Sequence, residues 1–385
     1  MKTIVHVYDY LHPHKGGPPQ VILNIARAQQ AQGSSIRLIS IDINEPEVQA
    51  FIQSELIASA QLFSLQPKGI RPIFSKALIR QALEGADIVH LHSIWPSPNL
   101  YVAHYCLQHN IPYILSIHGH LRPEALAIKA LKKKVGLALG YRAMLTGATV
   151  VHALNESEAQ DIKNFGLKAA IKVIPNGVRS EIFQEEEPRS SIENLIPALK
   201  NHEYLLFLSR IHPPKGATRL AQAFVRLSEA FPQLHLVIAG SDFGGIEEIK
   251  TVIAQAVQQQ PTLQERVHFP GFLSGRAKQA ALKHALAFCL PSDHEGFSVA
   301  VLESLAWGTA TVISTACHFP EMAQAQAGWI HELSVDSLYE SLVEVLSDTD
   351  TRKATAQKGR IWALDNFDWM QIEQQYNAMY ELCNV

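Results

Sequence analysis

The chain has 385 residues, 47% of them hydrophobic and 18% charged, a balance that excludes a disordered or fibrous protein. This length exceeds one typical core and fits two α/β domains of roughly 180 residues each. The net charge of −3 divides unevenly, since residues 1–180 carry +7 and residues 181–385 carry −10. Such a division either marks an anionic partner for the first half or reflects independent drift of two domains.

Short apolar runs alternate with helical patterns from end to end, which predicts βαβ units on parallel sheets. In the first half we expect strands at Thr3–Asp9, Ile36–Ile41, Asp87–His92, Tyr113–His118, Thr149–Ala153 and Lys172–Pro175. In the second half we expect them at Tyr204–Ser209, Leu234–Ala239, Val267–Phe269, Ala287–Pro291, Thr311–Ser314 and Gly328–His331. The predicted fold class is α/β, with two Rossmann-like, doubly wound domains.

The boundary between the domains is expected after Pro175-Asn176-Gly177-Val178, where the acidic tract 184–191 is typical of a surface linker. We therefore place an N-terminal domain at residues 1–180 and a C-terminal domain at residues 181–365. Residues 366–385 repeat apolar side chains at helical spacing and predict a final amphipathic helix.

Residues 88–121 contain no Asp, Glu, Lys or Arg, but three prolines interrupt the stretch, so no transmembrane helix is expected there. The N-terminus leads directly into a predicted strand, which gives no sign of a signal peptide. The four cysteines lie far apart without C-x-x-C spacing, as in a reduced protein. Together these features predict a cytoplasmic location.

Several predicted strands end in residues suited to ligand binding, and the carboxyl ends of strands are where α/β sheets bind ligands. Gly16 and Gly17 follow the first strand and lack a Cβ, so the backbone there can approach a ligand closely; a plain Gly/Pro turn is the alternative. His118 ends another strand and precedes Gly119; a structural histidine is the alternative, and His120 is the nearest competitor for the same role.

Arg210 and Lys215 lie five residues apart in the loop after the first strand of the second half. Arginine offers a planar fork and lysine a point charge, and both suit a diphosphate. Two solvated loop cations are the alternative.

Glu295 and Glu303 follow the predicted strand Ala287–Pro291, eight residues apart. A helix is expected to start between them, with Val299, Leu302 and Leu305 on its inner face. The amides of the intervening residues would then point at the carboxyl edge of the sheet; these residues are Gly296, Phe297 and Ser298. Such amides can bind the phosphates of a sugar diphosphate, and the two carboxylates can bind its hydroxyls. The alternative is a surface helix that carries two glutamates.

The order of these segments resembles that of the retaining GT-B glycosyltransferases of family 4, also called glycosyltransferase group 1, over nearly the whole chain. The resemblance implies two domains facing a central cleft, an acceptor-binding domain first and a donor-binding domain second. It also implies that the terminal helix crosses back onto the first domain. The implied reaction moves a hexose from a nucleoside-diphosphate sugar to a hydroxyl of a glycan or lipid-linked saccharide in polysaccharide biosynthesis.

The resemblance also implies roles for individual residues. His118 and Glu295 would act at the reaction centre, and Glu303 would hold the ribose hydroxyls of the donor. Further donor contacts are implied for Gly16, Gly17, Arg210, Lys215, Gly296, Phe297 and Ser298. Asp348-Thr349-Asp350 has D-x-D spacing that would suit a metal, but we interpret it as a helix N-cap. No cofactor and no required metal are expected.

Residues 128–139 predict a basic amphipathic helix with an apolar face formed by Ile128, Leu131, Val135, Ala138 and Leu139. Its opposite face and flanks carry Lys129, Lys132, Lys133 and Lys134. Such a helix can bind an anionic membrane, with about 1 kcal/mol contributed by each cation, so peripheral association with the inner face of the cytoplasmic membrane is predicted. The alternative is an ordinary helix whose apolar face enters the core.

Two other functions stay open. A nucleotide-sugar epimerase on the same fold would convert the donor without an acceptor, and a non-catalytic nucleotide-sugar-binding subunit would bind the donor without turnover. An NAD-dependent dehydrogenase is disfavoured because neither half contains G-x-G-x-x-G. No nucleic acid partner is expected.

Overall fold

The structure is a computed structural model that describes residues 2–66 and 74–383. The chain divides into two compact units, Met1–Gly177 together with Trp369–Val385, and Val178–Asp368. The expected boundaries at residues 180 and 365 each differ from these by three residues. Residues 1, 67–73 and 384–385, which fall within the predicted N-terminal domain and final helix, lie outside the described residues.

The first unit contains a seven-stranded parallel sheet of order β3-β2-β1-β4-β5-β6-β7. Its strands are β1 Thr3–Val7, β2 Ser35–Ser40, β3 Gln61–Ser64, β4 Ile88–His92, β5 Tyr113–Ser116, β6 Val150–Ala153 and β7 Ala170–Val173. The strand order reverses between β1 and β4, and α/β sheets bind ligands at such a switch point.

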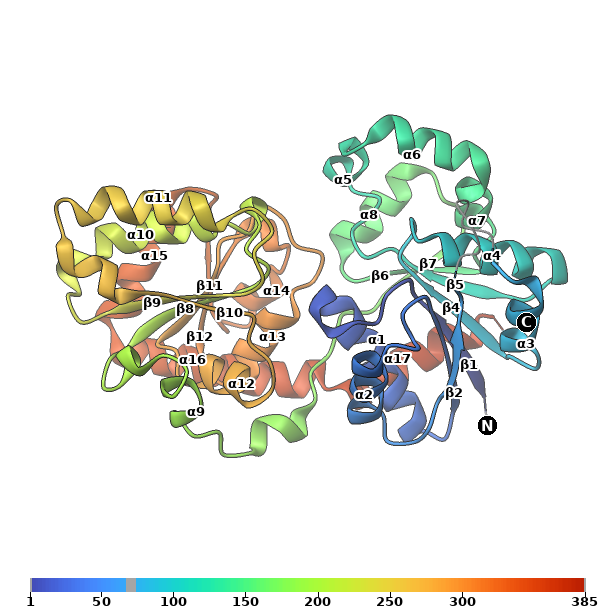
Figure 1. Cartoon of the computed structure of the whole chain (residues 1–385), viewed down its shortest axis with the longest axis horizontal. Coiled ribbons are helices and arrows are strands. Elements are labelled where there is room, and N and C mark those ends of the chain that lie inside the picture. The colour runs from blue at the N-terminus through green and yellow to red at the C-terminus, as the bar shows by residue number, and fades with distance from the viewer. Residues whose placement is uncertain (1, 67–73, 384–385) are drawn as a thin grey trace. The chain divides into compact units, whose positions relative to one another are not determined.

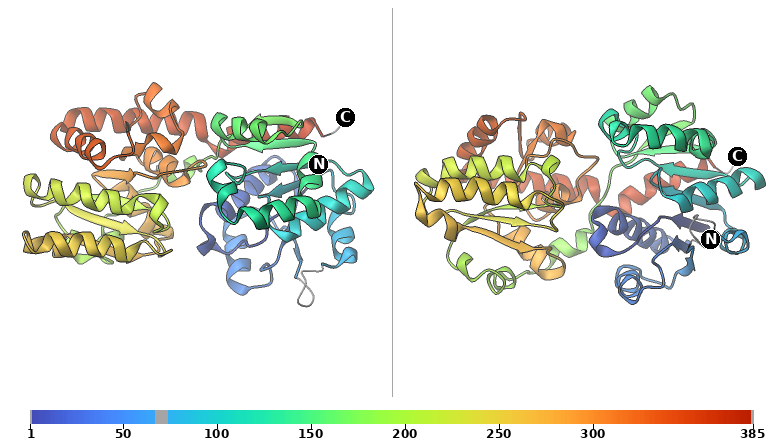
Figure 2. Two further views of the ribbon diagram at one scale, coloured as in Figure 1. Left: turned by 90° about the horizontal axis from the view of Figure 1, so that it is seen from above. Right: turned by 45° about the horizontal axis from the view of Figure 1, so that its top comes forward.

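Helices cover both faces of this sheet. They are α1 Gly17–Ala31, α2 Pro46–Glu55, α3 Lys76–Leu83, α4 Ser97–His109, α5 Pro123–Ala127, α6 Ala130–Gly136, α7 Arg142–Thr146, α8 Glu156–Phe165 and α17 Trp369–Glu381. Helix α17 comes from the end of the chain and packs against α1, and in both views of Figure 2 this red segment lies among the elements of the first unit. Helices α3, α4 and α7 pack on the other face (Figure 1).

The two faces of the first sheet differ in polarity. Successive residues of a strand point to opposite faces, and one face contributes Val5, Val7, Val89, Leu91, Leu115 and Val151 to the apolar core of the unit. The face toward α1 and α17 instead carries His6, His90, His92, Ser116 and His152, each at most 1% exposed. Buried parallel strands are usually apolar throughout, so this polar face needs its own explanation.

The second unit contains a six-stranded parallel sheet of order β10-β9-β8-β11-β12-β13. Its strands are β8 Tyr204–Leu208, β9 His235–Ala239, β10 Val267–Gly271, β11 Ala287–Leu290, β12 Ala310–Ser314 and β13 Trp329–His331. Its helices are α9 Ser190–Glu193, α10 Ala217–Ala230, α11 Ile246–Val257, α12 Gly275–Lys283, α13 Val299–Ala306, α14 Glu321–Gln324, α15 Val335–Ser347 and α16 Thr349–Phe367. The switch point lies between β8 and β11, and helix layers enclose the sheet (Figure 1).

The predicted fold class is confirmed, since both sheets are parallel and doubly wound. Each predicted strand is present with ends that agree to within two residues, but the sequence pattern does not predict β3. Its residues lie at the sheet edge and are half-buried or exposed, so they lack the continuous apolar run by which the inner strands are recognised. Among the described residues, no helix combines the length and the apolar character that crossing a membrane requires.

Candidate active site

The loop between β8 and α10 carries Arg210 and Lys215 and lies against the loop that follows β11. The amide of Asp293 donates to the carbonyl of Pro214 at 2.7 Å. Gly216 permits this approach because its φ is +76° and a Cβ there would lie 1.9 Å from the carbonyl oxygen of Pro291. Two segments that are far apart in the sequence therefore meet at the switch point of the second sheet.

Lys215 and Glu295 form an ion pair at this edge. The Nζ atom of Lys215 lies 2.6 Å from Oε1 of Glu295, and the two side chains are 17% and 8% exposed. An amine this close to a carboxylate in a largely dry setting is a charge-assisted hydrogen bond. The backbone amide of Glu295 donates to Ala316 at 3.2 Å, which fixes the start of the loop.

Glu303 lies in α13 and is held by a lysine that the sequence motifs did not mark. Its Oε1 accepts from Nζ of Lys278, in α12, at 2.7 Å. Its Oε2 is buried and has no hydrogen-bond partner among the described residues. A buried acceptor without a partner is costly, so this oxygen is suited to accept a hydrogen bond from a ligand hydroxyl.

Arg210 is exposed, unlike Lys215. Its guanidinium lies 5.5 Å from the ring centre of Phe243, in the loop after β9. This contact orients the side chain while the fork of N–H donors stays at the surface. Arg210, Lys215 and Glu295 thus lie on loops of one sheet edge, as the sequence predicted.

The segment Gly296, Phe297 and Ser298 differs from expectation in one respect. The helix starts only at Val299, which is half-buried, whereas Leu302 and Leu305 are buried as predicted. The ring of Phe297 packs 5.0 Å from that of Phe319 and joins an aromatic cluster of the second unit. Any donor contact of Phe297 therefore falls to its backbone.

In the first unit, Gly16 lies between a short 3₁₀ turn, Pro13–Lys15, and Gly17, the first residue of α1. Gly16 has a φ of +94°, a region that favours glycine. Gly17 begins the helix, and no heavy atom lies within 4 Å of a Cβ built on it. The prolines that follow occupy the first helical turn, where their missing N–H groups have no helical partner to lose.

His118 follows β5 in a tight turn. His118 and Gly119 have φ values of +52° and +77°, and the amide of His120 donates to the carbonyl of Ile117 at 3.3 Å. Left-handed conformations at both central residues are typical of a type I′ turn. Burial lowers the pKa of His118 to about 3, helped by the nearby His152 and His120, so the imidazole is neutral at pH 7.

Glu158, in α8, is a residue that sequence reasoning missed. Its carboxylate accepts from the amides of Gly119 and Leu154, and burial raises its pKa despite these bonds. The side chain thereby fixes the turn that presents His118. Its position one turn after the N-cap Asn155 resembles ordinary capping, so no sequence signal distinguishes it.

The prediction of one amphipathic helix over residues 128–139 is wrong. Lys129 is left-handed with a φ of +53°, α6 ends at Gly136, and a π-helical segment, Leu137–Tyr141, contains non-helical backbone at Leu139 and Gly140. The alternative of an apolar face in the core is also wrong, because four of the five apolar side chains are strongly exposed: Ile128 64%, Leu131 77%, Val135 51% and Leu139 74%. Of the four lysines, Lys133 turns inward and donates to the carbonyl of Ala125.

The N-cap interpretation of Asp348 is confirmed, since its carboxylate accepts from the amides of Asp350 and Thr351. Within the described ranges, two other groups have metal-ligand composition. One is His6, His90 and His92, which is buried. The other is His12, His14 and Glu47, which lies next to the Gly16 loop and is partly exposed.

Two protein-family models match most of the chain. The family described as Glycosyl transferases group 1 matches residues 191–362, and Glycosyltransferase Family 4 matches residues 15–181. A GDP-mannose:cellobiosyl-diphosphopolyprenol alpha-mannosyltransferase of Xanthomonas campestris is 23% identical over 98% of this chain and 96% of its own length. A phosphatidyl-myo-inositol mannosyltransferase of Mycobacterium leprae is 24% identical over 95% and 93%.

Solved structures resemble the whole fold. HepE of Anabaena, crystallised in complex with UDP and glucose, has a TM-score of 0.78 at 20% identity and covers 99% of this chain and 100% of its own. WaaG, a glycosyltransferase involved in lipopolysaccharide biosynthesis, has a TM-score of 0.72 at 16% identity and covers 98% and 99%. With its two Rossmann-like units and the two family matches, the chain belongs to the group 1, family 4 glycosyltransferases of the GT-B fold.

Proposed function

We propose that the protein transfers a hexose from a nucleoside-diphosphate sugar to a hydroxyl of a glycan or lipid-linked saccharide, with retention of the anomeric configuration and without a metal. The observation that carries the proposal is the ion pair of Lys215 with Glu295 at one sheet edge of the second unit, with Arg210 on the same loop as Lys215 and Glu303 on the helix that follows the Glu295 loop. Two cations and two carboxylates there match the diphosphate and the hydroxyls of such a donor.

Each of these residues has a role in the proposal. The unpaired Oε2 of Glu303 accepts a hydrogen bond from a ribose hydroxyl, while Lys278 donates a hydrogen bond to its Oε1. Lys215 has three N–H donors, so it can keep Glu295 in place and still donate to a phosphate oxygen. Glu295 then accepts from a hydroxyl of the donor sugar.

The chemistry follows from charge development. Departure of the nucleoside diphosphate places negative charge on its distal phosphate, and Arg210 and Lys215 stabilise that charge by several kcal/mol, about the contribution of one preorganised donor. The departing phosphate takes the proton of the acceptor hydroxyl in a front-face substitution. No covalent nucleophile is assigned. His118 and the Gly16–Gly17 loop act from the first unit, which binds the acceptor.

The names of the relatives suggest which substrates to try first. The Xanthomonas relative is named for GDP-mannose and a polyprenol-linked acceptor, and the Mycobacterium relative for a phosphatidylinositol. We therefore propose a lipid-linked acceptor and test GDP-mannose beside UDP- and ADP-sugars.

We further propose peripheral binding of the first unit to an anionic membrane at the cytoplasmic face. The segment 128–139 presents strongly exposed apolar side chains together with exposed Lys129, Lys132 and Lys134. Next to it, an apolar groove of about 280 Å³ is lined by α4, α7 and Leu139. Apolar insertion and lysine attraction to anionic lipids act together in such surfaces.

The experiment is a donor panel with the purified protein in EDTA, in which thermal stability and release of nucleoside diphosphate are measured. A donor at ~100 times its Kd should add about 2.7 kcal/mol of stability. Glu303→Ala should lose this response, whereas Glu248→Ala, an exposed glutamate of α11, should keep it. Unchanged donor affinity in Glu303→Ala would remove its assigned role. Conversion of the donor without an acceptor would indicate an epimerase, and binding without turnover a non-catalytic subunit.

A further inference from the structure

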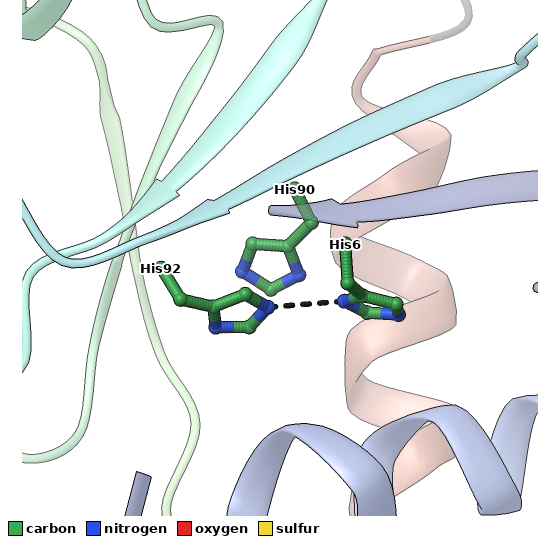
Figure 3. Close-up of side chains that lie close together, drawn as sticks. All are labelled: His6, His90 and His92. Atoms are coloured by element: carbon green, nitrogen blue, oxygen red, sulfur yellow. Dashed lines mark hydrogen bonds between the residues drawn. The ribbon is translucent and has the colours of Figure 1, made fainter. Parts of the chain in front are cut away.

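The polar face of the first sheet forms a cluster of buried histidines. Register brings them together, because His6 pairs with His90 across β1 and β4, and His92, Ser116 and His152 pair across β4, β5 and β6. Figure 3 shows the rings of His6, His90 and His92 gathered on one side of their strands, with the bond between His6 and His92 drawn. The rings of His90 and His92 stack with centroids 4.1 Å apart.

One half of the cluster is a series of hydrogen bonds that ends on the main chain. His152 Nε2 lies 2.8 Å from the carbonyl oxygen of Ile174, and its Nδ1 lies 2.7 Å from Ser116 Oγ. Ser116 Oγ lies 2.7 Å from His90 Nε2. His90 Nδ1 lies 2.9 Å from the hydroxyl of Tyr380, which belongs to α17.

The other half continues from that hydroxyl toward the candidate active site. Gln29 of α1 donates from Nε2 to Tyr380 at 2.8 Å, and its Oε1 lies 2.8 Å from His6 Nε2. His6 Nδ1 lies 3.0 Å from His92 Nε2. His92 Nδ1 lies 3.5 Å from His118 Nε2, the longest link. A single series of eight hydrogen bonds thus connects His118 to Ile174.

The protons in the first half can be assigned from the carbonyl end. Burial lowers the pKa of His152 to about 4, so at pH 7 the ring is neutral and has one N–H. A carbonyl only accepts, which puts that proton on Nε2 of His152 and makes its Nδ1 an acceptor for Ser116. The serine has no second proton, so it accepts from His90 Nε2. His90 Nδ1 then accepts from Tyr380.

The same reasoning fixes the second half. The hydroxyl of Tyr380 accepts from the amide of Gln29, whose oxygen accepts from His6 Nε2. Burial lowers the pKa of His6 to about 4 and holds that of His92 well below its usual value, so both rings are neutral. His6 Nδ1 therefore accepts from His92 Nε2, and His92 Nδ1 accepts from His118 Nε2. Every donor points the same way, an arrangement in which successive bonds strengthen one another.

We propose that this hydrogen-bond series fixes His118 as the Nε2-protonated tautomer, with the Nδ1 lone pair left to accept a hydrogen bond from a hydroxyl of a bound sugar. Gln29 and Tyr380 are then positioning residues, and α17 supports the active site through Tyr380. The functional part rests on the proposed role of His118. The series also explains why histidines occupy a face that would otherwise be apolar.

A metal ion is the competing explanation for three close imidazoles, since one ligand atom of each lies within 4.8 Å of the others. All six ring nitrogens of His6, His90 and His92 already take part in the series. An ion bound through one nitrogen of each ring would have to break the hydrogen bonds that those nitrogens make. The satisfied hydrogen bonds favour the metal-free arrangement.

The direct test is a long-range ¹H–¹⁵N spectrum of the full chain labelled at histidine, with His118 assigned by its loss in His118→Gln. We expect His6, His90, His92, His118 and His152 each to show one neutral tautomer protonated at Nε2. A proton on Nδ1 of any of the five, or averaged nitrogen shifts for His118 in the native protein, would overturn the proposal. So would stoichiometric metal in the purified protein that is lost with His6→Gln.

The functional test compares variants of the series. Gln29→Leu and Tyr380→Phe interrupt it and should give His118 averaged nitrogen shifts, with kcat/KM for diphosphate release falling roughly ten-fold, as for loss of one hydrogen bond. Gln29→Glu should keep the native His118 nitrogen shifts and the native kcat/KM, because a buried protonated carboxyl offers one donor and one acceptor, as the glutamine amide does. Tyr376→Phe is the matched control: the hydroxyl of this neighbouring buried tyrosine lies 3.4 Å from His152 Nε2 and is not a link of the series, and the phenylalanine keeps its ring contacts with His90 and Tyr380.

The two proposals fail separately. If the tautomers are as assigned but no donor is turned over, the proposed function is wrong and the arrangement of protons stands. If turnover is found and Gln29→Leu, with its folding verified by circular dichroism, leaves the His118 spectrum and kcat/KM unchanged, the positioning role is wrong and the transferase function stands.

Discussion

The buried histidines predict that acid destabilises the first unit. Burial lowers the pKa of His6 from 6.5 to about 4, so between these values the unfolded chain binds a proton that the folded chain does not. Stability therefore rises with pH through this window and is lost as the pH falls from about 6.5 to 4. From pH 7 to pH 5 the loss from His6 is about 2 kcal/mol.

His152, whose pKa burial also lowers to about 4, contributes a similar loss. The pKa values of His90 and His92 are held still lower by burial and by neighbouring histidines. Two such groups already amount to about 4 kcal/mol, a large part of the 5–15 kcal/mol typical of a folded domain. Mild acid should therefore unfold the first unit in the absence of any ligand.

The assay is urea unfolding at pH 7 and pH 5, followed by limited proteolysis and mass spectrometry, which reports peptides of the first unit separately. His6→Gln should reduce the pH-dependent loss by about 2 kcal/mol, since one titrating group is removed. His104→Asn, on the exposed side of α4, should leave it unchanged. Equal losses in the native protein and His6→Gln would refute the assignment of a neutral buried His6.

Three further predictions concern the loops, the donor site and the surface. Gly216→Ala should destabilise the second unit by about 2 kcal/mol or more in urea unfolding, because the new Cβ would meet the carbonyl of Pro291. Gly244→Ala is the control: its φ of +90° is similar but no atom lies near its Cβ, so it measures only the free energy cost of the left-handed backbone conformation. Equal effects of the two would contradict the close approach of the loops. Lys278→Met should weaken donor binding several-fold in calorimetry, as Glu303 loses its partner; wild-type affinity would show that Lys278 does not orient it. Leu131→Glu should reduce binding to phosphatidylglycerol vesicles about ten-fold or more, while Ile361→Glu, an exposed apolar residue of the second unit, should not; parallel losses would exclude docking through residues 128–139.

The sequence predicts which candidate site residues lie at strand ends, because the end of a strand is a local property. Each apolar run predicted a strand, and in a parallel α/β sheet all carboxyl ends lie on one edge. The sequence therefore predicts Arg210, Lys215 and Glu295 on that edge, where the structure has them. The ion pair of Lys215 with Glu295 could not be predicted from local sequence pattern, because the two residues are 80 positions apart.

Two features were decided only by the tertiary structure. The exposure of residues 128–139 depends on the left-handed Lys129 and the break at Gly140, which helical periodicity cannot anticipate because it assumes an unbroken helix. The histidine series depends on strand register and on α17, which brings Tyr380 to His90 across 290 residues of sequence. Periodicity and composition determined the elements and the sheet edge that carries the candidate site residues. Long-range packing determined which of those groups are paired, buried and neutral, because burial and hydrogen bonding exist only once distant segments meet.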